Sequence, residues 1–287
     1  MRNRVALLML ASLLLMGCQS EPEGSEREAA AEVQETSPEA TPISEAAKTE
    51  MANDETDRFS GLETDLEQIR EILKIPGMSA AVVKDQELVW AGGFGFADLA
   101  NEVLATADTP YHLASVTKPI AATLVMQLVE EGVLDLETPV AQFGVELESE
   151  GVINSWHLLT HTSAGVPGSA HNYDGNRYGY LAEVVEGVTG GSFRDLLHER
   201  ILTPLGMEDT APNLILCPKG DDGEENDKRE ADYLRVHEAM ARPYQLDLAY
   251  DVVGGEYQTV FSPAAGLIST VSDIALFDIA LDQNKLL

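Results

Sequence analysis

The chain has 287 residues, of which 44% are hydrophobic, enough to bury one large core or two modest ones. Its formal net charge of −31 excludes nucleic acid and anionic membrane surfaces as partners, because phosphate binding needs clustered Lys and Arg. Only two cysteines, Cys18 and Cys217, are present, which excludes a disulfide framework and any CxxC metal or redox site.

The first residues follow the pattern of a bacterial lipoprotein signal. Two arginines precede an apolar run from Val5 to Met16, which is too short to span a bilayer and matches the hydrophobic region of a secretory signal. The run leads into Leu15-Met16-Gly17-Cys18, which resembles a lipobox, where the cysteine receives lipid and becomes the first mature residue. We therefore predict a signal peptide over residues 1–17 and a protein anchored outside the cytoplasm by lipid on Cys18. An ordinary signal peptide or a buried helix is the alternative.

Residues 18–58 are expected to form an acidic tether. From Gln19 to Asp57 the chain is dominated by Glu, Ala, Ser, Thr and Pro and has no aromatic residue, so it cannot bury enough apolar surface to offset the entropy of ordering. Its like charges should keep it extended. The folded domain is predicted over residues 59–287.

The domain is expected to open with a helix and a β-hairpin. Ser60 and Glu63 have the spacing of a capping box at a helix start. Two β-prone runs follow, Met78–Val83 and Glu87–Ala91, separated by a short polar turn. The glycines at 92, 93 and 95 are interpreted as a loop, and they lack the spacing of a dinucleotide-binding fingerprint.

A Ser-x-x-Lys pair, Ser115 and Lys118, begins the next predicted helix. Residues three apart lie on one helix face, so the lysine amine can reach the serine hydroxyl and help it act as a nucleophile. Pro119 fits the first turn of a helix that starts at Ala114 or Ser115 and ends at Gly132. Taken alone, the pair is also typical of an ordinary surface helix.

Two histidines and a tyrosine follow. His157 and His161 are spaced i, i+4, as in some zinc sites, but no Glu follows the first and no third ligand is near in sequence, so we favour a structural role. Tyr173 and Asp174 open a turn-rich stretch before a helix predicted from Tyr178 to Gly190.

The rest of the chain is predicted to be helical, with one insertion. Ser192 and Asp195 cap a helix that Pro204 breaks. The charged run from Lys219 to Arg229 is interpreted as a solvated surface insertion, because its spacing is not that of a calcium loop. A last helix, capped by Thr270 and Asp273, reaches Leu281.

Five motifs occur in one order along the chain: Ser115-Val-Thr-Lys118, His157-Leu-Leu-Thr-His161-Thr-Ser163, Tyr173-Asp-Gly175, Pro204-Leu-Gly-Met207 and Ala265-Gly-Leu-Ile-Ser-Thr270. Together they resemble the class C-like serine β-lactamase and penicillin-binding protein family over nearly all of Phe59 to Leu287. The combination is far more specific than any single motif.

The resemblance implies a role for each site residue. Ser115 would be the nucleophile that is acylated, Lys118 its proton-handling partner, and Tyr173 the first residue of the family's Tyr-x-Asn motif. Whether Lys118 or Tyr173 is the general base stays open. The family's Asn falls at Gly175, so the amide that often holds substrate is missing there, and Asn176 is the substitute at the substrate site.

The resemblance also implies the fold. We expect an α/β (α+β) protein with an antiparallel sheet flanked by helices, and an all-helical lobe from about Pro119 to Thr210. The family's later Lys-Thr-Gly or His-x-Gly strand does not appear before Leu287, so we expect a truncated gene with the C-terminal strands missing. That strand would supply one of two oxyanion-hole donors.

The expected function is an extracytoplasmic serine hydrolase acting on a β-lactam, a D-Ala peptide or a small ester. It would need no metal or organic cofactor, and we expect a monomer whose partner is a small-molecule or peptidoglycan-peptide substrate. Two rivals are kept: a non-catalytic lipoprotein that binds or senses such ligands through the same cleft, and a metalloenzyme using His157 and His161.

Overall fold

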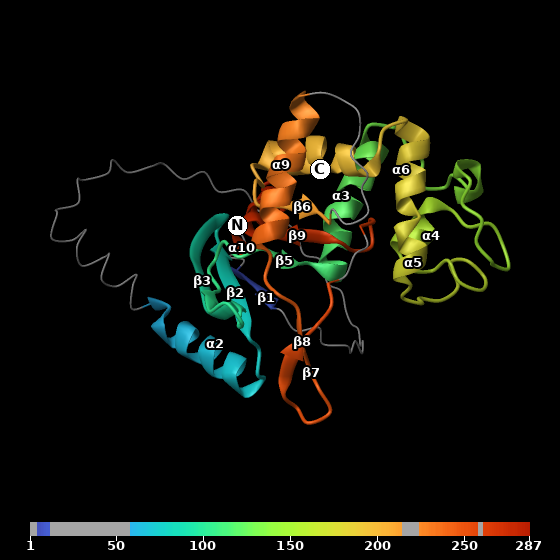
Figure 1. The fold of residues 1–287 in the computed structure, drawn as a ribbon. Coiled ribbons are helices and arrows are strands. Elements are labelled where there is room, and N and C mark those ends of the chain that lie inside the picture. The colour runs from blue at the N-terminus through green and yellow to red at the C-terminus, as the bar shows by residue number, and fades with distance from the viewer. Residues whose placement is uncertain (1–4, 12–57, 214–223, 258–260) are drawn as a thin grey trace, which may run out of the picture.

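Three antiparallel sheets and a group of helices make up the fold (Figure 1). The computed structural model describes residues 5–11, 58–213, 224–257 and 261–287. The first sheet has the order β1-β2-β3-β4, the second β5-β9-β6, and the third is the β7-β8 hairpin. The strands are β1 (Val5–Ala11), β2 (Gly77–Lys84), β3 (Glu87–Asp98), β4 (Val103–Leu104), β5 (Tyr111–His112), β6 (Ala211–Pro212), β7 (Tyr244–Leu246), β8 (Val252–Gly254) and β9 (Leu267–Ser269).

Helices lie to one side of these sheets and against their faces. Figure 1 shows α4, α5 and α6 gathered on one side, with α3 between them and the strands. The helices are α2 (Ser60–Ile72), η1 (Ala114–Val116), α3 (Thr117–Glu130), η2 (Val140–Phe143), α4 (Ser155–Leu159), α5 (Gly175–Gly179), α6 (Leu181–Thr189), α7 (Phe193–Leu197), η3 (His198–Leu202), α8 (Thr203–Leu205), α9 (Glu224–Ala239) and α10 (Val271–Asp282). The antiparallel sheets and the helical lobe agree with the predicted fold.

Strand β2 is buried on both faces because a helix covers each one. Alternate residues of a strand point to opposite faces. Met78 and Ala80 join a cluster with Leu66 of α2, whereas Ala81 belongs to the large core that α10 also enters. The small side chains of this strand allow α2 and α10 to sit on opposite sides of the sheet.

The predicted glycine loop after residue 91 is wrong, because β3 continues to Asp98. Gly92 and Gly93 pair with Ala80 and Ser79 of β2. A Cβ on Gly93 would lie 2.4 Å from the carbonyl oxygen of Ala105, so only glycine allows the crossing backbone to approach. In this strand, glycine marks a close contact between backbones rather than a turn.

The predicted capping box at Ser60 and Glu63 is also wrong. The N-cap position is Phe59, which has a helical backbone (φ −105°, ψ −1°) and makes no side-chain cap. Glu63 instead accepts a hydrogen bond of 2.9 Å from the Trp90 indole. The caps predicted at Ser192 and Thr270 are confirmed, since each side chain accepts from the backbone N–H three residues later.

Residues Val5–Ala11 of the apolar run near the chain start form strand β1, which pairs with β2. It pairs antiparallel, with Val5 opposite Lys84 and Ala11 opposite Met78. Cys18 and the predicted tether lie outside the described residues, so the lipid anchor stays a prediction. Among the described helices, none has the length and apolar content needed to cross a membrane.

The second part of the charged run before residue 230 is helical. The first part of the run lies outside the described residues, whereas the chain from Glu224 forms α9. Arg229 makes an ion pair of 2.8 Å with Asp195, and Glu230 pairs with Arg194. The prediction of a solvated insertion is wrong for Arg229, which meets a partner on α7. Lys228 beside it is exposed, as predicted.

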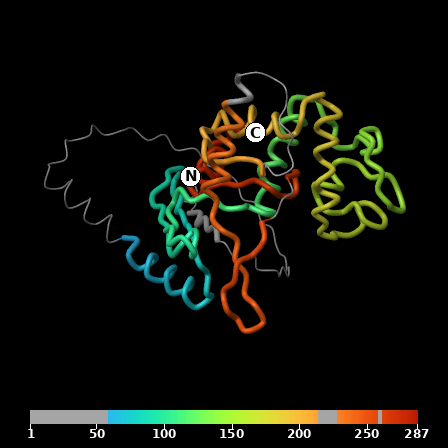
Figure 2. Tube along the Cα trace, in the orientation of Figure 1, coloured from blue at the N-terminus to red at the C-terminus, as the bar shows by residue number. Residues whose placement is uncertain are grey.

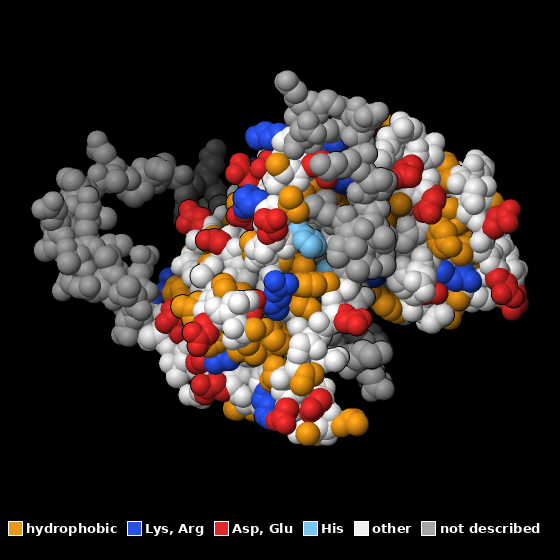
Figure 3. All heavy atoms as spheres, viewed as in Figure 1, with side chains coloured by type: hydrophobic (Ala, Val, Ile, Leu, Met, Phe, Trp, Pro, Cys, Tyr) orange, Lys and Arg blue, Asp and Glu red, His pale blue; other side chains and the backbone are white. Residues whose placement is uncertain are grey.

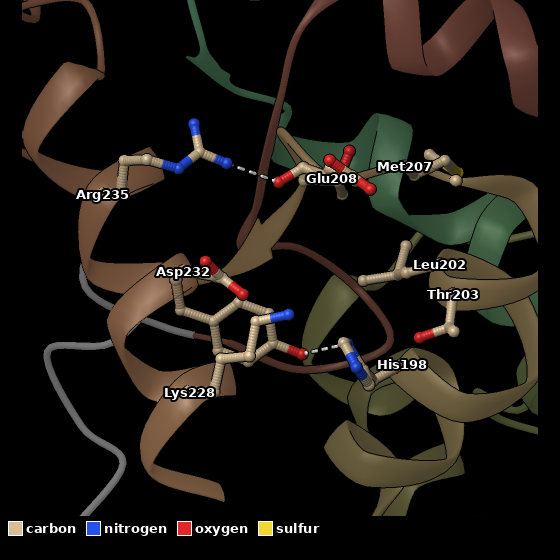
Figure 4. A pocket seen from close by; sticks show the side chains of 11 residues that line it. His198, Leu202, Thr203, Met207, Glu208, Lys228, Asp232 and Arg235 are labelled. Atoms are coloured by element: carbon tan, nitrogen blue, oxygen red, sulfur yellow. Dashed lines mark hydrogen bonds between the residues drawn. The ribbon is translucent and has the colours of Figure 1, made fainter. Parts of the chain in front are cut away.

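A cavity of about 320 Å³ separates α9 from the η3–α8 segment (Figure 4). Across it, the buried Tyr233 lies with its hydroxyl 2.9 Å from His198 Nδ1, and Arg235 donates to the Glu208 carbonyl at 2.9 Å. Burial raises the pKa of Tyr233 and lowers the pKa of His198, so a protonated phenol donates to a neutral imidazole. This contact holds α9 against the helical lobe.

The β7-β8 hairpin projects from the body of the molecule, as the backbone trace shows (Figure 2). Its turn carries Leu248 and Tyr250, which are both exposed, and the Tyr250 carbonyl accepts from Lys74 of the α2 end at 2.6 Å. Acidic side chains are spread over the visible face rather than gathered in one patch (Figure 3).

Asp273, at the start of α10, is a buried carboxyl that should make the free energy of unfolding depend on pH. It accepts hydrogen bonds from Asp209 N at 2.9 Å and Thr210 Oγ1 at 2.7 Å. Burial raises its pKa from 3.8 to about 6, with Asp209 and Glu208 adding to the effect. The folded state then binds this proton more tightly than the unfolded state. Its contribution to the free energy of unfolding should fall by about 2 kcal/mol as pH rises from about 4 to about 6.

Asp273→Asn is expected to remove this fall in the free energy of unfolding with rising pH. The amide oxygen can still accept both hydrogen bonds, but the side chain carries no charge. Urea unfolding at about pH 4.5 and pH 7 should show a smaller loss of stability with rising pH in the variant than in the original chain. Asp65→Asn, which neutralises an exposed carboxylate of α2, is the matched control. Equal pH dependence in the Asp273 variant and the original chain would contradict the prediction.

Candidate active site

Ser115 lies in a tight turn between strand β5 and helix α3. The 3-10 turn η1 contains it and leads directly into α3 at Thr117, as the predicted helix start requires. The preceding residue, Ala114, has a left-handed backbone (φ 46°), which a non-glycine residue adopts only under constraint. Its N–H donates to His112 Nδ1 at 3.1 Å. Burial lowers the pKa of His112, which keeps that nitrogen free to accept. The turn leaves the Ser115 side chain exposed.

Lys118 points its amine into the space beside Ser115. It lies on the first turn of α3 and is only 9% exposed. Its Nζ lies 3.1 Å from Ser115 Oγ, 2.7 Å from Tyr173 OH and 2.8 Å from the carbonyl oxygen of Ala264. Three oxygen neighbours fix the amine in one position, and the carbonyl ties it to the segment that leads into β9.

Tyr173 completes a closed triangle with Ser115 and Lys118. Its hydroxyl lies 2.7 Å from Ser115 Oγ, and its ring centroid lies 4.9 Å from Lys118 Nζ. The three residues come from η1, α3 and the loop before α5. The structure therefore brings together the three residues that the sequence assigned to catalysis.

A network around Asp174 holds the loop that carries Tyr173. Asp174 caps α5 by accepting from Arg177 N at 3.0 Å and pairs with the Arg177 guanidinium at 3.7 Å. Arg177 also donates to the carbonyl oxygens of Ser163 and Glu148 at 2.8 and 2.6 Å. The guanidinium thus joins three loops of the helical lobe. These contacts fix the loop that carries Tyr173 on the side away from Ser115.

His161 packs against the tyrosine and was not predicted to do so. Its ring lies 4.5 Å from the ring of Tyr173 and 5.2 Å from that of Tyr178, and its Nδ1 accepts from Asp174 N at 3.2 Å. Burial, with the nearby charge of Lys118, lowers the pKa of His161 and favours the neutral ring that this contact needs. The left-handed backbone at His161 (φ 56°) turns the chain so that the contact forms.

The two histidines weighed as zinc ligands are used as hydrogen-bond acceptors. His157 Nδ1 accepts from Asn154 N at 2.9 Å at the start of α4, while His161 accepts from the loop before α5. No group of three or more His, Cys, Asp or Glu in the described part of the chain is placed to hold a metal ion. Their positions match the structural role favoured from the sequence.

The triangle lies in a cleft of about 720 Å³, within the range of small-ligand sites. Gly175 and Asn176, predicted as substrate-binding residues, both line it. A Cβ on Gly175 would lie 3.8 Å from Lys118 Nζ, which is ordinary contact, so the position has room for a Cβ atom. The remaining lining residues are Gly179, Tyr180, Ala182, Glu183, Phe261, Ser262, Ala264 and Ala265.

This geometry suits proton transfer to and from a serine hydroxyl. Both the Tyr173 oxygen and the Lys118 amine are within hydrogen-bond reach of Ser115 Oγ, so either can take its proton. Burial raises the pKa of Tyr178 to about 12, and that residue stays a phenol donating to the Lys118 carbonyl at 3.2 Å. It supports the backbone of α3.

The chain is similar in sequence to known proteins along part of its length. The D-aminopeptidase of Brucella anthropi is 31% identical over 182 residues, which cover 52% of this chain and 35% of that protein. Penicillin-binding protein 4 of Amycolatopsis lactamdurans is 32% identical over 167 residues, 46% of this chain and 44% of that protein. The chain thus spans less than half the length of these two relatives.

A solved structure and a family model agree with these relatives. The octameric penicillin-binding protein homologue from Pyrococcus abyssi superposes with a TM-score of 0.66 at 25% identity, covering 78% of this chain and 56% of that one. The Beta-lactamase family model matches residues 63–287, which include every residue of the triangle. The chain belongs to the beta-lactamase family.

Proposed function

We propose that the protein is a serine hydrolase that forms an acyl-enzyme on Ser115 with an amide or ester. The observation that carries the proposal is the closed triangle, in which Ser115 Oγ lies 2.7 Å from Tyr173 OH and 3.1 Å from Lys118 Nζ at the side of an open cleft. A β-lactam, a D-amino-acid peptide and a small ester all contain the carbonyl group that this chemistry needs.

The reaction would proceed in two transfers of an acyl group. Ser115 Oγ bonds to the substrate carbonyl carbon while its proton passes to Lys118 or Tyr173, and the same pair then protonates the leaving amine or alcohol. A water molecule next attacks the ester on Ser115 and gives its proton to that pair. Release of the acid and return of the proton to Oγ restore the starting state.

Labelling by a fluorophosphonate probe tests the proposal on the full chain. The probe phosphonylates nucleophilic serines with loss of fluoride, so intact mass should rise by one adduct, and peptide mapping should place it on Ser115. A chain that takes up no probe would contradict the proposal and leave the non-catalytic binding protein as the better description.

We also propose that the protein works outside the cytoplasm, held to a bacterial membrane by lipid. Support comes from the sequence alone: basic residues, an apolar run and the lipobox-like segment that ends at Cys18. In cells fed a labelled fatty acid, the chain should carry the label, and Cys18→Ser should lose it. Equal labelling of both chains would contradict the anchor.

A further inference from the structure

The turn that carries Ser115 is anchored to strand β9 on both sides. Before the turn, Leu113 N donates to the Leu267 carbonyl at 2.8 Å. After it, the buried hydroxyl of Thr117 accepts from Leu267 N at 3.2 Å. These two bonds fix where the turn begins and ends, but neither bond is made by Ala114, whose backbone decides how Ser115 is presented.

Ala114 needs a further constraint, because its backbone is left-handed (φ 46°), a conformation that is strained for a residue with a Cβ. With both ends of the turn anchored, φ of Ala114 relaxes most directly by rotation of the planar peptide between Leu113 and Ala114. The N–H of that peptide donates to His112 Nδ1 at 3.1 Å, and its carbonyl accepts from Val116 N at 3.0 Å. The His112 side chain therefore opposes the rotation that would relieve the strain.

The chemistry of His112 fits this contact. The residue lies on β5 opposite Ile268 of β9. Its Nε2 is buried and has no hydrogen-bond partner in the part of the chain that the structure describes. Burial lowers the pKa of the ring, so Nδ1 is unprotonated and accepts from Ala114 N. An apolar side chain would fill the same space without burying an unpaired N–H, but it could not accept this bond.

We infer that His112 is a positioning residue for the nucleophile: its Nδ1 holds the peptide before Ala114, and this keeps the turn in the form that presents Ser115 Oγ to the cleft. The inference rests on the proposed acyl transfer and adds a residue to it. His112 does not line the cleft, so it acts through the turn. Loss of the bond would let Oγ move from its positions 2.7 Å from Tyr173 OH and 3.1 Å from Lys118 Nζ.

Two amide side chains of different reach test this role. In His112→Asn the acceptor oxygen is bonded to Cγ, as Nδ1 is in histidine, so it can still accept from Ala114 N. In His112→Gln the oxygen lies one carbon farther along the side chain and cannot take the same place. The rate of Ser115 labelling by the fluorophosphonate probe is measured for each chain, together with kcat and KM for an activated ester. Labelling and kcat should stay within about threefold in the Asn variant and fall by about 10- to 100-fold in the Gln variant, with little change in KM.

A glycine at position 114 tests whether the effect passes through the turn. Glycine adopts a positive φ without the strain of a Cβ, so the turn needs less support from His112. The loss caused by His112→Gln should therefore shrink to about threefold or less when both compared chains carry Ala114→Gly. An equal loss in the two backgrounds would show that His112 does not act through this backbone and would overturn the inference.

His237→Gln is the matched control. His237 is a half-buried histidine of α9 that lies outside the cleft, and its buried Nε2 also has no hydrogen-bond partner among the described residues. This variant should label and hydrolyse within about twofold of the original chain.

The tautomer of His112 can be read in the original chain, so the test does not depend on the folding of a variant. Side-chain nitrogen-15 spectra should show the His112 proton on Nε2 and a free Nδ1, and a proton on Nδ1 would overturn the inference. Equal rates in the original, Asn and Gln chains, or an Asn variant as slow as the Gln variant, would overturn it and keep the proposed function. An original chain that takes up no probe would overturn both.

Discussion

Replacement of Ser115 by alanine is expected to reduce kcat for ester or amide hydrolysis by about 10⁵- to 10⁶-fold, the scale seen when a serine hydrolase loses its nucleophile. The triangle contains no second oxygen that could replace Oγ. Tyr173 OH is 2.7 Å from Oγ, but it belongs to a ring held by His161 and cannot take the place of the serine at the substrate carbonyl. Steady-state kinetics with an activated ester, followed over hours, would measure the residual rate.

Two controls make this result specific to the nucleophile. Ser272→Ala removes a hydroxyl on α10 that bonds Asp108 and lies outside the cleft, so it should retain activity within about twofold. Ser115 is exposed, and the alanine variant should keep the unfolding midpoint of the original chain. Retention of more than about a tenth of the activity by Ser115→Ala would show that another residue carries the acyl group.

A helix-capping pattern in the sequence predicted the cap correctly where the capping residue has an extended backbone. Ser192 and Thr270 have extended backbones (ψ 144° and 163°), so their side chains can turn back to the helix N–H groups, and both predicted caps form. The same pattern at Ser60 fails because the residue before it is already helical. A capping pattern gives only the residue types, whereas tertiary contacts decide the backbone conformation. Here the contact is the hydrogen bond from Trp90 to Glu63.

The candidate site also has a part that local sequence predicts and a part that it does not. Ser115 and Lys118 are close in sequence, so helical spacing was enough to pair them. Tyr173 was placed only by resemblance, because its distance from Lys118 depends on how the helical lobe packs. The contact of Lys118 with the Ala264 carbonyl joins segments 146 residues apart, and the contact of Tyr173 with the His161 ring bridges a loop. No local pattern contains that information.

The glycines of β3 show a further limit. A cluster of glycines predicts a turn when only backbone freedom is considered. In this fold Gly93 is needed because the Ala105 backbone crosses it, and a Cβ would lie 2.4 Å from that carbonyl oxygen. Whether a glycine serves a turn or a close approach is decided by a partner strand that the local sequence does not identify.

Lys118→Ala is expected to reduce kcat by about 10³- to 10⁴-fold, since the amine contacts both Ser115 Oγ and Tyr173 OH. If the amine itself is the base, the proton loses its acceptor. If Tyr173 is the base, it loses the positive charge that stabilises a phenolate. Both assignments therefore predict a large loss, and Lys118→Ala alone does not separate them.

Lys118→Arg and Tyr173→Phe separate the two assignments. An arginine keeps the positive charge and cannot accept a proton, so it should be as inactive as Lys118→Ala if the amine is the base and partly active if Tyr173 is. Tyr173→Phe keeps the ring against His161 and removes only the hydroxyl. Tyr173→Phe should therefore lower activity less than Lys118→Arg does if the Lys118 amine is the base, and more if Tyr173 is the base. Single-turnover acylation rates give the comparison, and near-full activity of Lys118→Ala would contradict both assignments.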